Sequence, residues 1–248
     1  MTVARYPYTQ VSYRIGPGPL TPAVKFLIIG NVVVFLASMV MPMLTAYLGL
    51  MPAAVLENFW LWQPVTYMFV HASLTHLVLN MLMLWMFGVE IERLWGTEAF
   101  ARFYAFCGLG AAATTIVASL LPFGYASFMY ITTTVGASGA IYGVLLAYGL
   151  TFPNRPIYMY LLFPVPAKYF VMITGAITLL LSVNAGGGRV AHLAHLGGLL
   201  TGWLLLSRGR GGLVAELKYR YTKWRLNRAR RRFGVHPGGR GGGGWNVH

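Results

Sequence analysis

Three groups of polar residues lie inside long apolar runs of this 248-residue sequence. Polar side chains at such positions are costly to bury and mark candidates for function. In chain order the groups are His71, His76 and Asn80; Gly136-Ala137-Ser138-Gly139 with Tyr142; and His192 and His195 with Gly197, Gly198 and Gly202. A serine hydroxyl becomes a good nucleophile only beside a base, and histidine, with an ordinary pKa of about 6.5, is suited to that role. The groups therefore predict nucleophilic catalysis by a serine and a histidine.

The positions of these residues within their runs favour a shared site. Ser138 is expected at the beginning of a helix, where backbone N–H groups and the helix dipole favour developing negative charge. His76 and Asn80 are four residues apart, so they share one face of a helix, and both could donate to an oxyanion. The three groups also begin near the same end of their runs. Either His192 or His195 could reach Ser138 if the two glycine-containing helices pack closely.

Each residue also has a purely structural interpretation. Ser138 could be a small residue that lets two membrane helices approach, and Gly198 with Gly202 forms a G-x-x-x-G packing pattern. Asn80 and His195 could each hydrogen-bond a neighbouring helix. The four histidines could instead bind a transition metal in a transporter or channel. The sequence shows no internal repeat that would support a transporter, and a metal site would leave the G-A-S-G segment unexplained. A zinc protease is not indicated either, because the sequence has no H-E-x-x-H motif.

The apolar runs that carry these residues are predicted to be transmembrane helices. The chain is 57% hydrophobic and only 10% charged, whereas a soluble domain has roughly 25% charged residues. This composition excludes a soluble globular protein, a disordered chain and a collagen-like chain. The predicted fold class is therefore all-α, a polytopic membrane protein with six transmembrane helices. The predicted spans are residues 26–44, 74–89, 100–120, 136–151, 169–183 and 190–206, with a partly helical aromatic loop at 47–69 and a further loop at 121–135.

The charged residues predict the orientation and the division of the chain. The net charge is +14, and eleven of the 19 Lys and Arg residues follow Ser207. Basic residues also separate predicted spans two from three and four from five, so the positive-inside rule places both termini in the cytoplasm. We divide the chain into a cytoplasmic N-terminal segment (1–22), a membrane domain (23–207) and a basic, glycine-rich cytoplasmic tail (208–248). Residues 208–232 could contact anionic lipid or act only as a topology signal, and no nucleic-acid partner is predicted.

The absence of aspartate and the presence of a single cysteine limit the mechanisms and metal sites that the chain could support. The sequence contains no aspartate, which excludes a Ser-His-Asp triad and aspartate-rich magnesium or calcium sites. Its single cysteine, Cys107, cannot form an internal disulfide or a cysteine-based zinc site and is expected to be a core residue. We therefore predict no metal site and no cofactor.

Taken in order, the motifs resemble those of the rhomboid family of intramembrane serine proteases. The resemblance covers about residues 26–206 and implies a rhomboid-like helical bundle. Trp62-Gln63 stands where family members often have Trp-Arg. The matches are H-x-x-x-x-H-x-x-x-N at 71–80, E-x-x-x-G at 92–96, G-x-S-G at 136–139 and A-H-x-x-G-x-x-x-G at 194–202.

The resemblance implies a role for each matched residue. Ser138 would be the nucleophile and His195 the general base, since the A-H-x-x-G frame fits His195 rather than His192. His76, Asn80 and the backbone N–H of Ser138 would donate to the oxyanion. The ring of Tyr142 would pack against the imidazole of His195. The supporting positions would be Tyr142, His71, Gly136, Gly139, Gly198 and Gly202.

The implied activity is that of an intramembrane serine endopeptidase, which cleaves transmembrane segments of other membrane proteins near the outer face of the membrane. Its substrates would carry a helix-destabilised segment, because a protease binds an extended strand and a stable helix hides its carbonyl groups. A six-span chain of this family is typical of a bacterial plasma (inner) membrane. The alternative is a rhomboid-like fold that binds membrane proteins without catalysis. Such pseudoproteases lack the dyad, whereas Ser138 and His195 are both present.

Overall fold

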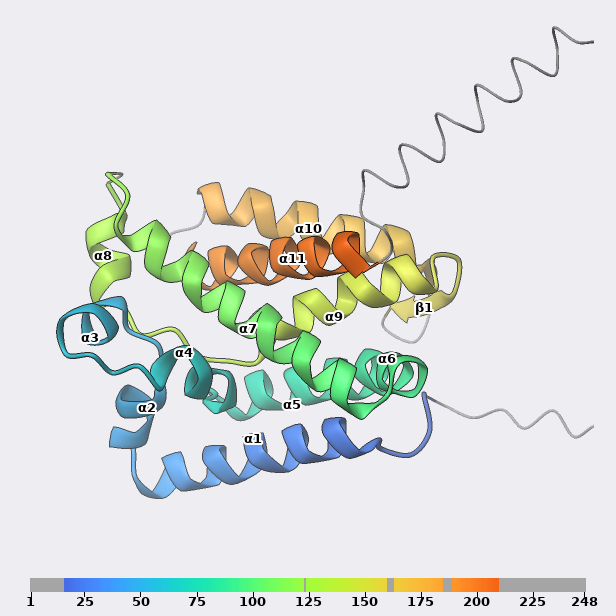
Figure 1. Cartoon of the computed structure of the whole chain (residues 1–248), viewed down its shortest axis with the longest axis horizontal. Coiled ribbons are helices and arrows are strands. Elements are labelled where there is room, and N and C mark those ends of the chain that lie inside the picture. The colour runs from blue at the N-terminus through green and yellow to red at the C-terminus, as the bar shows by residue number, and fades with distance from the viewer. Residues whose placement is uncertain (1–15, 123, 160–162, 185–188, 210–248) are drawn as a thin grey trace, which may run out of the picture. The chain divides into compact units, whose positions relative to one another are not determined.

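The computed structural model describes residues 16–122, 124–159, 163–184 and 189–209, and helices make up most of this part of the chain (Figure 1). The chain divides into two units, Met1–Leu205 and Leu206–His248. The all-α class is confirmed. The principal apolar helices are α1 (Pro22–Val40), α5 (Leu74–Met83), α6 (Val89–Trp95), α7 (Thr97–Ser119), α9 (Ser138–Thr151), α10 (Ala167–Asn184) and α11 (Arg189–Gly209).

Four of the described helical segments are long and apolar enough to cross a membrane. They are Pro22–Val40, Leu74–Trp95, Thr97–Ser119 and Val190–Ser207. The second of these combines α5 and α6, which are joined by the π-helical turn η2 (Leu84–Gly88). The helices that match predicted spans four and five, Ser138–Thr151 and Ala167–Ser182, are shorter. The count of six transmembrane spans therefore stays a prediction, as does the division of the chain at residues 22 and 207.

The connections between the helices differ in part from the predictions. Residues 47–69 are partly helical as expected, and the short helices of this region are α2 (Met43–Leu48), α3 (Pro52–Glu57), α4 (Gln63–Thr66) and η1 (Tyr67–Phe69). The loop prediction for 121–135 is wrong at α8 (Ala126–Ile131). A β-hairpin, which the sequence analysis did not anticipate, joins α9 to α10 through β1 (Pro156–Met159) and β2 (Phe163–Pro166). Its strands are antiparallel, with Pro156 opposite Pro166.

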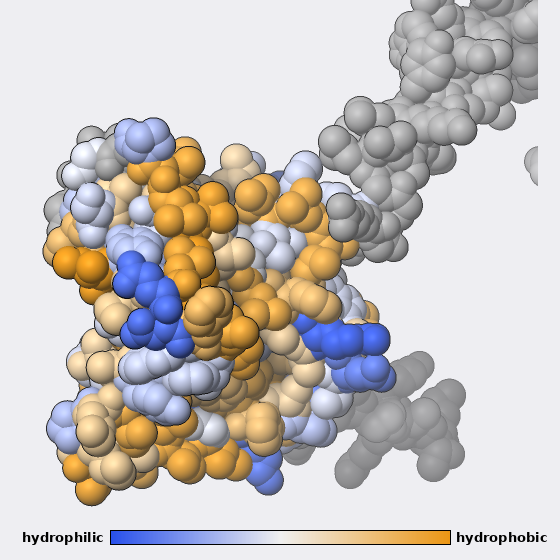
Figure 2. Space-filling model, turned by 60° about the vertical axis from the view of Figure 1, so that its left-hand side comes forward, coloured by the Kyte–Doolittle hydropathy of each residue, from blue (hydrophilic) through white to orange (hydrophobic). Residues whose placement is uncertain are grey.

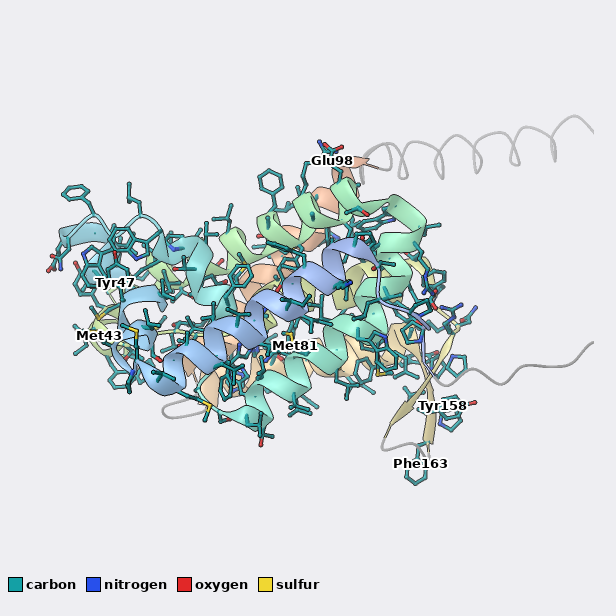
Figure 3. All side chains as sticks on the ribbon, turned by 90° about the horizontal axis from the view of Figure 1, so that it is seen from below. Met43, Tyr47, Met81, Glu98, Tyr158 and Phe163 are labelled. Atoms are coloured by element: carbon teal, nitrogen blue, oxygen red, sulfur yellow. The ribbon has the colours of Figure 1, made fainter. Side chains whose placement is uncertain are left out.

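The connections gather at opposite ends of the long helices. In Figure 1, α2, α3, α4 and α8 lie at one end, and α6 and the hairpin lie at the other. Figure 3 shows Met43 and Tyr47 at the first end and shows Tyr158 and Phe163 projecting from the hairpin at the second. The short helix α9 packs against α7, α10 and η2. Because protein surrounds α9, it can begin within the depth of a membrane without exposing its backbone to lipid.

Apolar side chains cover much of the outer surface of the long helices. Figure 2 shows a face on which hydrophobic residues predominate and hydrophilic residues are confined to separate patches. Exposed examples include Phe26 and Val33 on α1 and Met172 and Leu180 on α10. In water such a surface would promote aggregation, whereas in lipid it is the expected exterior of a membrane protein.

The end of the bundle that carries α6 and the hairpin is held by polar contacts. The buried carboxylate of Glu92 accepts hydrogen bonds from the backbone N–H groups of Ala23 (2.9 Å) and Val24 (3.0 Å) at the beginning of α1. It also accepts hydrogen bonds from the hydroxyl groups of Thr21 (2.5 Å) and of Thr97 (2.8 Å), the first residue of α7. An anionic acceptor at a helix N-terminus satisfies N–H groups that have no partner within the helix. Glu92 therefore fixes three helix ends together.

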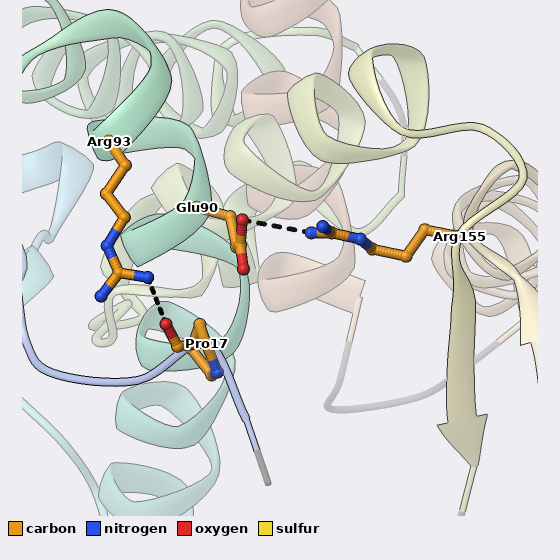
Figure 4. Close-up of polar contacts among 4 residues, drawn as sticks. All are labelled: Pro17, Glu90, Arg93 and Arg155. Carbon is orange, nitrogen blue, oxygen red and sulfur yellow. Dashed lines mark hydrogen bonds and ion pairs between the residues drawn. The ribbon is translucent and has the colours of Figure 1, made fainter. Parts of the chain in front are cut away.

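Two arginines add further links at this end (Figure 4). Arg93 donates to the carbonyl of Pro17, just before α1. Arg155 forms an ion pair with Glu90 across 3.1 Å. This pair connects α6 to the turn between α9 and the β-hairpin.

At the opposite end, Gln63 holds the aromatic loop at the position where the family pattern often has an arginine. Its buried amide donates from Nε2 to the carbonyls of Ala46 (3.2 Å) and Tyr47 (3.3 Å). Its Oε1 accepts the N–H of Met51 at 3.0 Å. Trp62 adds a bond from its ring nitrogen to the Tyr47 carbonyl at 2.9 Å. A neutral glutamine thus secures the loop through three hydrogen bonds.

Candidate active site

Ser138 is the first residue of α9. The segment before it, which contains Thr134 and Gly136, is bonded to other parts of the chain through its backbone. Thr134 exchanges backbone hydrogen bonds with Leu50 at 2.9 and 2.7 Å, and the N–H of Gly136 donates to the carbonyl of Tyr67 at 2.9 Å. Gly136 has φ +121°, a conformation that residues with a side chain rarely adopt. The segment before the serine is therefore attached to the aromatic loop and makes a turn that requires glycine.

Close packing of α11 against α9 brings His195 to Ser138. A Cβ atom at Gly198 would stand 2.7 Å from the carbonyl carbon of Gly139, and one at Gly202 would stand 3.0 Å from the Cα of Gly143. The two helix backbones therefore touch, as small residues permit in membrane bundles. In this arrangement the Nε2 atom of His195 lies 2.7 Å from the Oγ atom of Ser138. That distance is typical of a strong hydrogen bond.

The ring of Tyr142 lies flat against the imidazole of His195. The ring centroids are 4.2 Å apart and the planes differ by 7°. Tyr142 is one turn after Ser138 on α9, so one short helix presents both the hydroxyl and the stacking ring. The Nδ1 atom of His195 is buried and has no hydrogen-bond partner within the described part of the chain. A triad would hold this atom with a carboxylate, and here the stacked ring constrains the imidazole instead.

His76 approaches Ser138 from α5. Ser73, which precedes α5, accepts the N–H of His76 at 3.2 Å and caps the helix. The position that a Cβ would take at Gly136 is 2.9 Å from Nε2 of His76 and 3.7 Å from Oγ of Ser138. The glycine therefore leaves space between the serine and the imidazole. A reacting oxygen in that space would be within hydrogen-bond distance of a ring N–H.

Asn80 is buried one turn after His76, and its described hydrogen bond runs from Nδ2 to the His76 carbonyl at 2.8 Å. This bond uses one of the two amide protons and leaves the other to donate elsewhere. The structure places His71 beside His76, with ring centroids 4.9 Å apart in an edge contact. His71 lies in the loop before α5, and burial lowers its pKa to about 4, so it is neutral at pH 7.

The structure separates the two histidines of α11. The ring of His192 is 6.0 Å from that of His195, and the hydrogen bond to Ser138 comes from His195. Among the residues with described positions, no group of three or more His, Cys, Asp or Glu side chains is arranged to hold a metal ion. The described residues thus supply no metal-holding group made from His71, His76, His192 and His195.

Sequence reasoning missed several residues that support the site. Thr178 on α10 hydrogen-bonds the phenol of Tyr142. Tyr67 donates its hydroxyl to the Gly108 carbonyl at 2.8 Å. Leu50 aligns the segment before Ser138 through its bridge to Thr134. The only sequence signal for Thr178 was its position as a polar residue inside an apolar span. Leu50 acts through its backbone, so its residue type gave no signal.

An apolar helical bundle with four segments long enough to cross a membrane defines a class, the multi-pass membrane proteins, and this bundle holds a half-buried serine and histidine in hydrogen-bond contact. Residues 58–209 match the model of the Rhomboid domain. The chain belongs to the rhomboid family.

Several curated proteins are similar to this chain. "Rhomboid protein 1, mitochondrial" of Saccharomyces cerevisiae is 32% identical over 144 residues, which are 55% of this chain and 38% of the yeast protein. "Rhomboid protease GluP" of Bacillus subtilis is 29% identical over 149 residues, 57% of this chain and 25% of that protein. "Putative rhomboid protease YdcA" of B. subtilis is 29% identical over 146 residues, 58% of this chain and 65% of that protein. The chain thus spans less than two thirds of the length of each of these relatives.

Proposed function

We propose that this protein is an intramembrane serine endopeptidase that cleaves transmembrane segments of other membrane proteins through a Ser–His dyad. The observation that carries the proposal is the 2.7 Å contact between Ser138 Oγ and His195 Nε2 inside an apolar bundle. Family membership and the two relatives named as rhomboid proteases support the same activity. The presence of both dyad residues argues against the non-catalytic alternative.

The geometry supports an acyl-enzyme mechanism. Oγ of Ser138 attacks the scissile carbonyl carbon while its proton passes to Nε2 of His195. The oxyanion that forms accepts hydrogen bonds from the Ser138 backbone N–H, from His76 and from Asn80. Collapse of this intermediate breaks the C–N bond, and the departing amine takes the proton from His195. Water then attacks the serine ester with His195 as base, which releases a carboxylic acid and restores the serine.

The substrate must present an extended strand to Ser138. A stable transmembrane helix hides its carbonyl groups in its own hydrogen bonds, so cleavage is expected where Gly, Ala or Pro destabilises the helix. The partners we propose are therefore membrane proteins with such a segment, together with the lipid bilayer. Contact of residues 208–232 with anionic lipid also stays a proposal, because residues 210–248 lie outside the described part of the chain.

We also propose that both termini lie in the cytoplasm, an orientation that the distribution of charge supports. The plasma membrane of a bacterium stays a proposal that rests on the resemblance alone. Arg93, Arg155 and Lys168 lie at or next to the end formed by α6 and the hairpin. Glu57, at the opposite end, has its hydrogen bond from Tyr130 (2.7 Å), and this bond raises the pKa of the tyrosine. Basic residues favour the cytoplasmic side. The site at the start of α9 would then open toward the outer face.

The test uses the purified protein in liposomes with a fluorogenic transmembrane substrate. We compare the wild type with Ser138→Ala and His195→Ala, with and without a metal chelator. Ser182→Ala is the matched control, because the Ser182 hydroxyl bonds the carbonyl of Leu179 on its own helix at 2.7 Å. Wild type and Ser182→Ala should cleave, chelator should have no effect, and both dyad variants should be inactive while remaining folded.

A fluorophosphonate probe, which phosphonylates activated serines, makes the test independent of substrate choice. Labelling of Ser138 in the wild type, and its loss in His195→Ala, would support an activated nucleophile even where the chosen substrates are not cleaved. Cleavage by Ser138→Ala would refute the assignment. A folded wild type that neither cleaves nor reacts with the probe would favour a rhomboid-like fold that binds membrane proteins without catalysis.

A further inference from the structure

Thr178 lies on α10 and contacts the dyad through one intermediate residue. The residue is 2% exposed, and its hydroxyl donates to the phenol oxygen of Tyr142 at 3.0 Å. Tyr142 in turn stacks on His195, which hydrogen-bonds Ser138. A continuous set of contacts therefore runs from α10 through α9 and α11 to the nucleophile.

The phenol–threonine bond acts at the free end of the tyrosine ring. The backbone of α9 fixes the other end of the Tyr142 side chain, so a hydrogen bond at the hydroxyl restrains rotation about the Cα–Cβ bond and keeps the ring in one place. A tyrosine hydroxyl at this depth also needs a partner, because lipid supplies none. Thr178 thus holds the ring of Tyr142 at the position where it stacks on His195.

The imidazole of His195 depends on the position of the Tyr142 ring more than the histidine of a triad would. Its Nδ1 atom has no hydrogen-bond partner in the described part of the chain, so no carboxylate fixes the ring from behind. The rings of Tyr142 and His195 are nearly parallel at 7°. A rotation of the tyrosine would therefore remove the surface that keeps Nε2 directed at Ser138 Oγ.

We infer that Thr178 is a positioning residue whose hydroxyl orients Tyr142 and, through it, the catalytic base His195. The inference rests on the proposed function, because it assigns the effect to the serine–histidine reaction. If Thr178 acts in this way, the rate of cleavage also depends on the position of α10. That helix packs against α9 and the hairpin strands, and its outward side chains, such as Met172 and Ile177, are exposed.

The test separates the hydroxyl from the shape of the side chain. Thr178→Val keeps the shape and removes the hydroxyl, whereas Thr178→Ser keeps the hydroxyl. We measure kcat and KM in liposomes for both variants, for Tyr142→Phe and for the double variant Thr178→Val with Tyr142→Phe. The control is Thr174→Val, one turn earlier on α10. Folding is followed by thermal unfolding.

Loss of one hydrogen bond should lower kcat by about three- to tenfold and leave KM near the wild-type value. Tyr142→Phe should lose a similar factor, and the double variant should lose no more than either single variant, since both remove the same bond. Thr178→Ser should restore the rate, and Thr174→Val should match the wild type. A change in packing alone would not produce this combination of rescue and non-additivity.

Three results would overturn the inference. They are wild-type kcat in Thr178→Val, an equal loss in Thr178→Ser, or losses that multiply in the double variant. If Thr178→Val does not fold, Tyr142→Phe removes the same bond from the other side and decides the question. Failure of the proposed function looks different, because cleavage would then be absent in the wild type or would persist in Ser138→Ala.

Discussion

The close contact of α9 and α11 predicts that a single methyl group at Gly198 separates the nucleophile from its base. A Cβ placed there would stand 2.7 Å from the carbonyl carbon of Gly139 and closer still to the carbonyl oxygen. Carbon atoms that are not bonded prefer separations of about 3.5–4.0 Å. The obstacle is backbone in a helix and cannot rotate away as a side chain can. In Gly198→Ala, α11 must therefore move away by about 1 Å, which follows from that difference.

That displacement is large compared with the tolerance of the dyad. The Ser138 Oγ to His195 Nε2 distance is 2.7 Å, and an increase of about 1 Å would exceed the range of a hydrogen bond. A misplacement of this size can lower a rate by about 100-fold. Overpacking typically costs about 1–3 kcal/mol of stability, so the variant should remain folded but become nearly inactive. The assay is kcat in liposomes, with thermal unfolding of the same preparation.

Gly175→Ala provides the matched control. Gly175 lies on α10, and the nearest atom to a Cβ there is Cδ1 of Leu199 at 3.7 Å, an ordinary van der Waals contact. This variant should cleave at the wild-type rate and gain roughly 0.5–1 kcal/mol from the better helix propensity of alanine. Wild-type kcat in folded Gly198→Ala would refute the reasoning, because the glycine contact would then not set the distance between Ser138 and His195.

Two further substitutions test other parts of the structure. In Gly136→Ala the new methyl group would lie 2.9 Å from Nε2 of His76 at a residue with φ +121°, so kcat should fall about 100-fold or more through loss of the oxyanion space. The control is Gly124→Ala, whose methyl group would meet no atom of the described residues within 4 Å, its chain neighbours aside. An unchanged kcat in Gly136→Ala would contradict the placement of the oxyanion. Glu92→Gln removes the charge from a buried carboxylate that accepts four hydrogen bonds from α1, α7 and Thr21, so the melting temperature should fall, with a loss of about 1–3 kcal/mol. Glu98→Gln breaks only the exposed pair with Arg102 at 3.2 Å and should cost less than about 1 kcal/mol; equal melting temperatures for these two glutamine variants would argue against Glu92 as an anchor of α1.

The sequence was informative where a single physical effect dominates. Long apolar runs predict membrane helices because lipid requires them, and the boundaries of α1 and α7 lie within a few residues of the predicted spans. The glycines of α9 and α11 indicated close packing, and the A-H-x-x-G frame selected His195 over His192. In the structure, the hydrogen bond to Ser138 is made by His195 and not by His192.

The features that the sequence did not reveal depend on contacts between distant segments. Helix α8 is six residues long, too short for a hydrophobic period to distinguish it from a loop. The strands of the β-hairpin are four residues each and apolar, and periodicity cannot assign such a short apolar run to strand or helix. The bond between Thr178 and Tyr142 joins residues 36 positions apart, and no local pattern specifies such a pair.

A glutamine at position 63, in place of an arginine, affects how the aromatic loop responds to ionic strength. The amide of Gln63 both donates to and accepts from the loop backbone, and an arginine could only donate. A neutral group brings no charge to be stripped of water at the membrane surface. Its bonds are also not screened by dissolved ions, unlike the attraction between charged groups. The aromatic loop is bonded to the segment that precedes Ser138. It should therefore stay in place, and keep that segment in place, across a wide range of ionic strength.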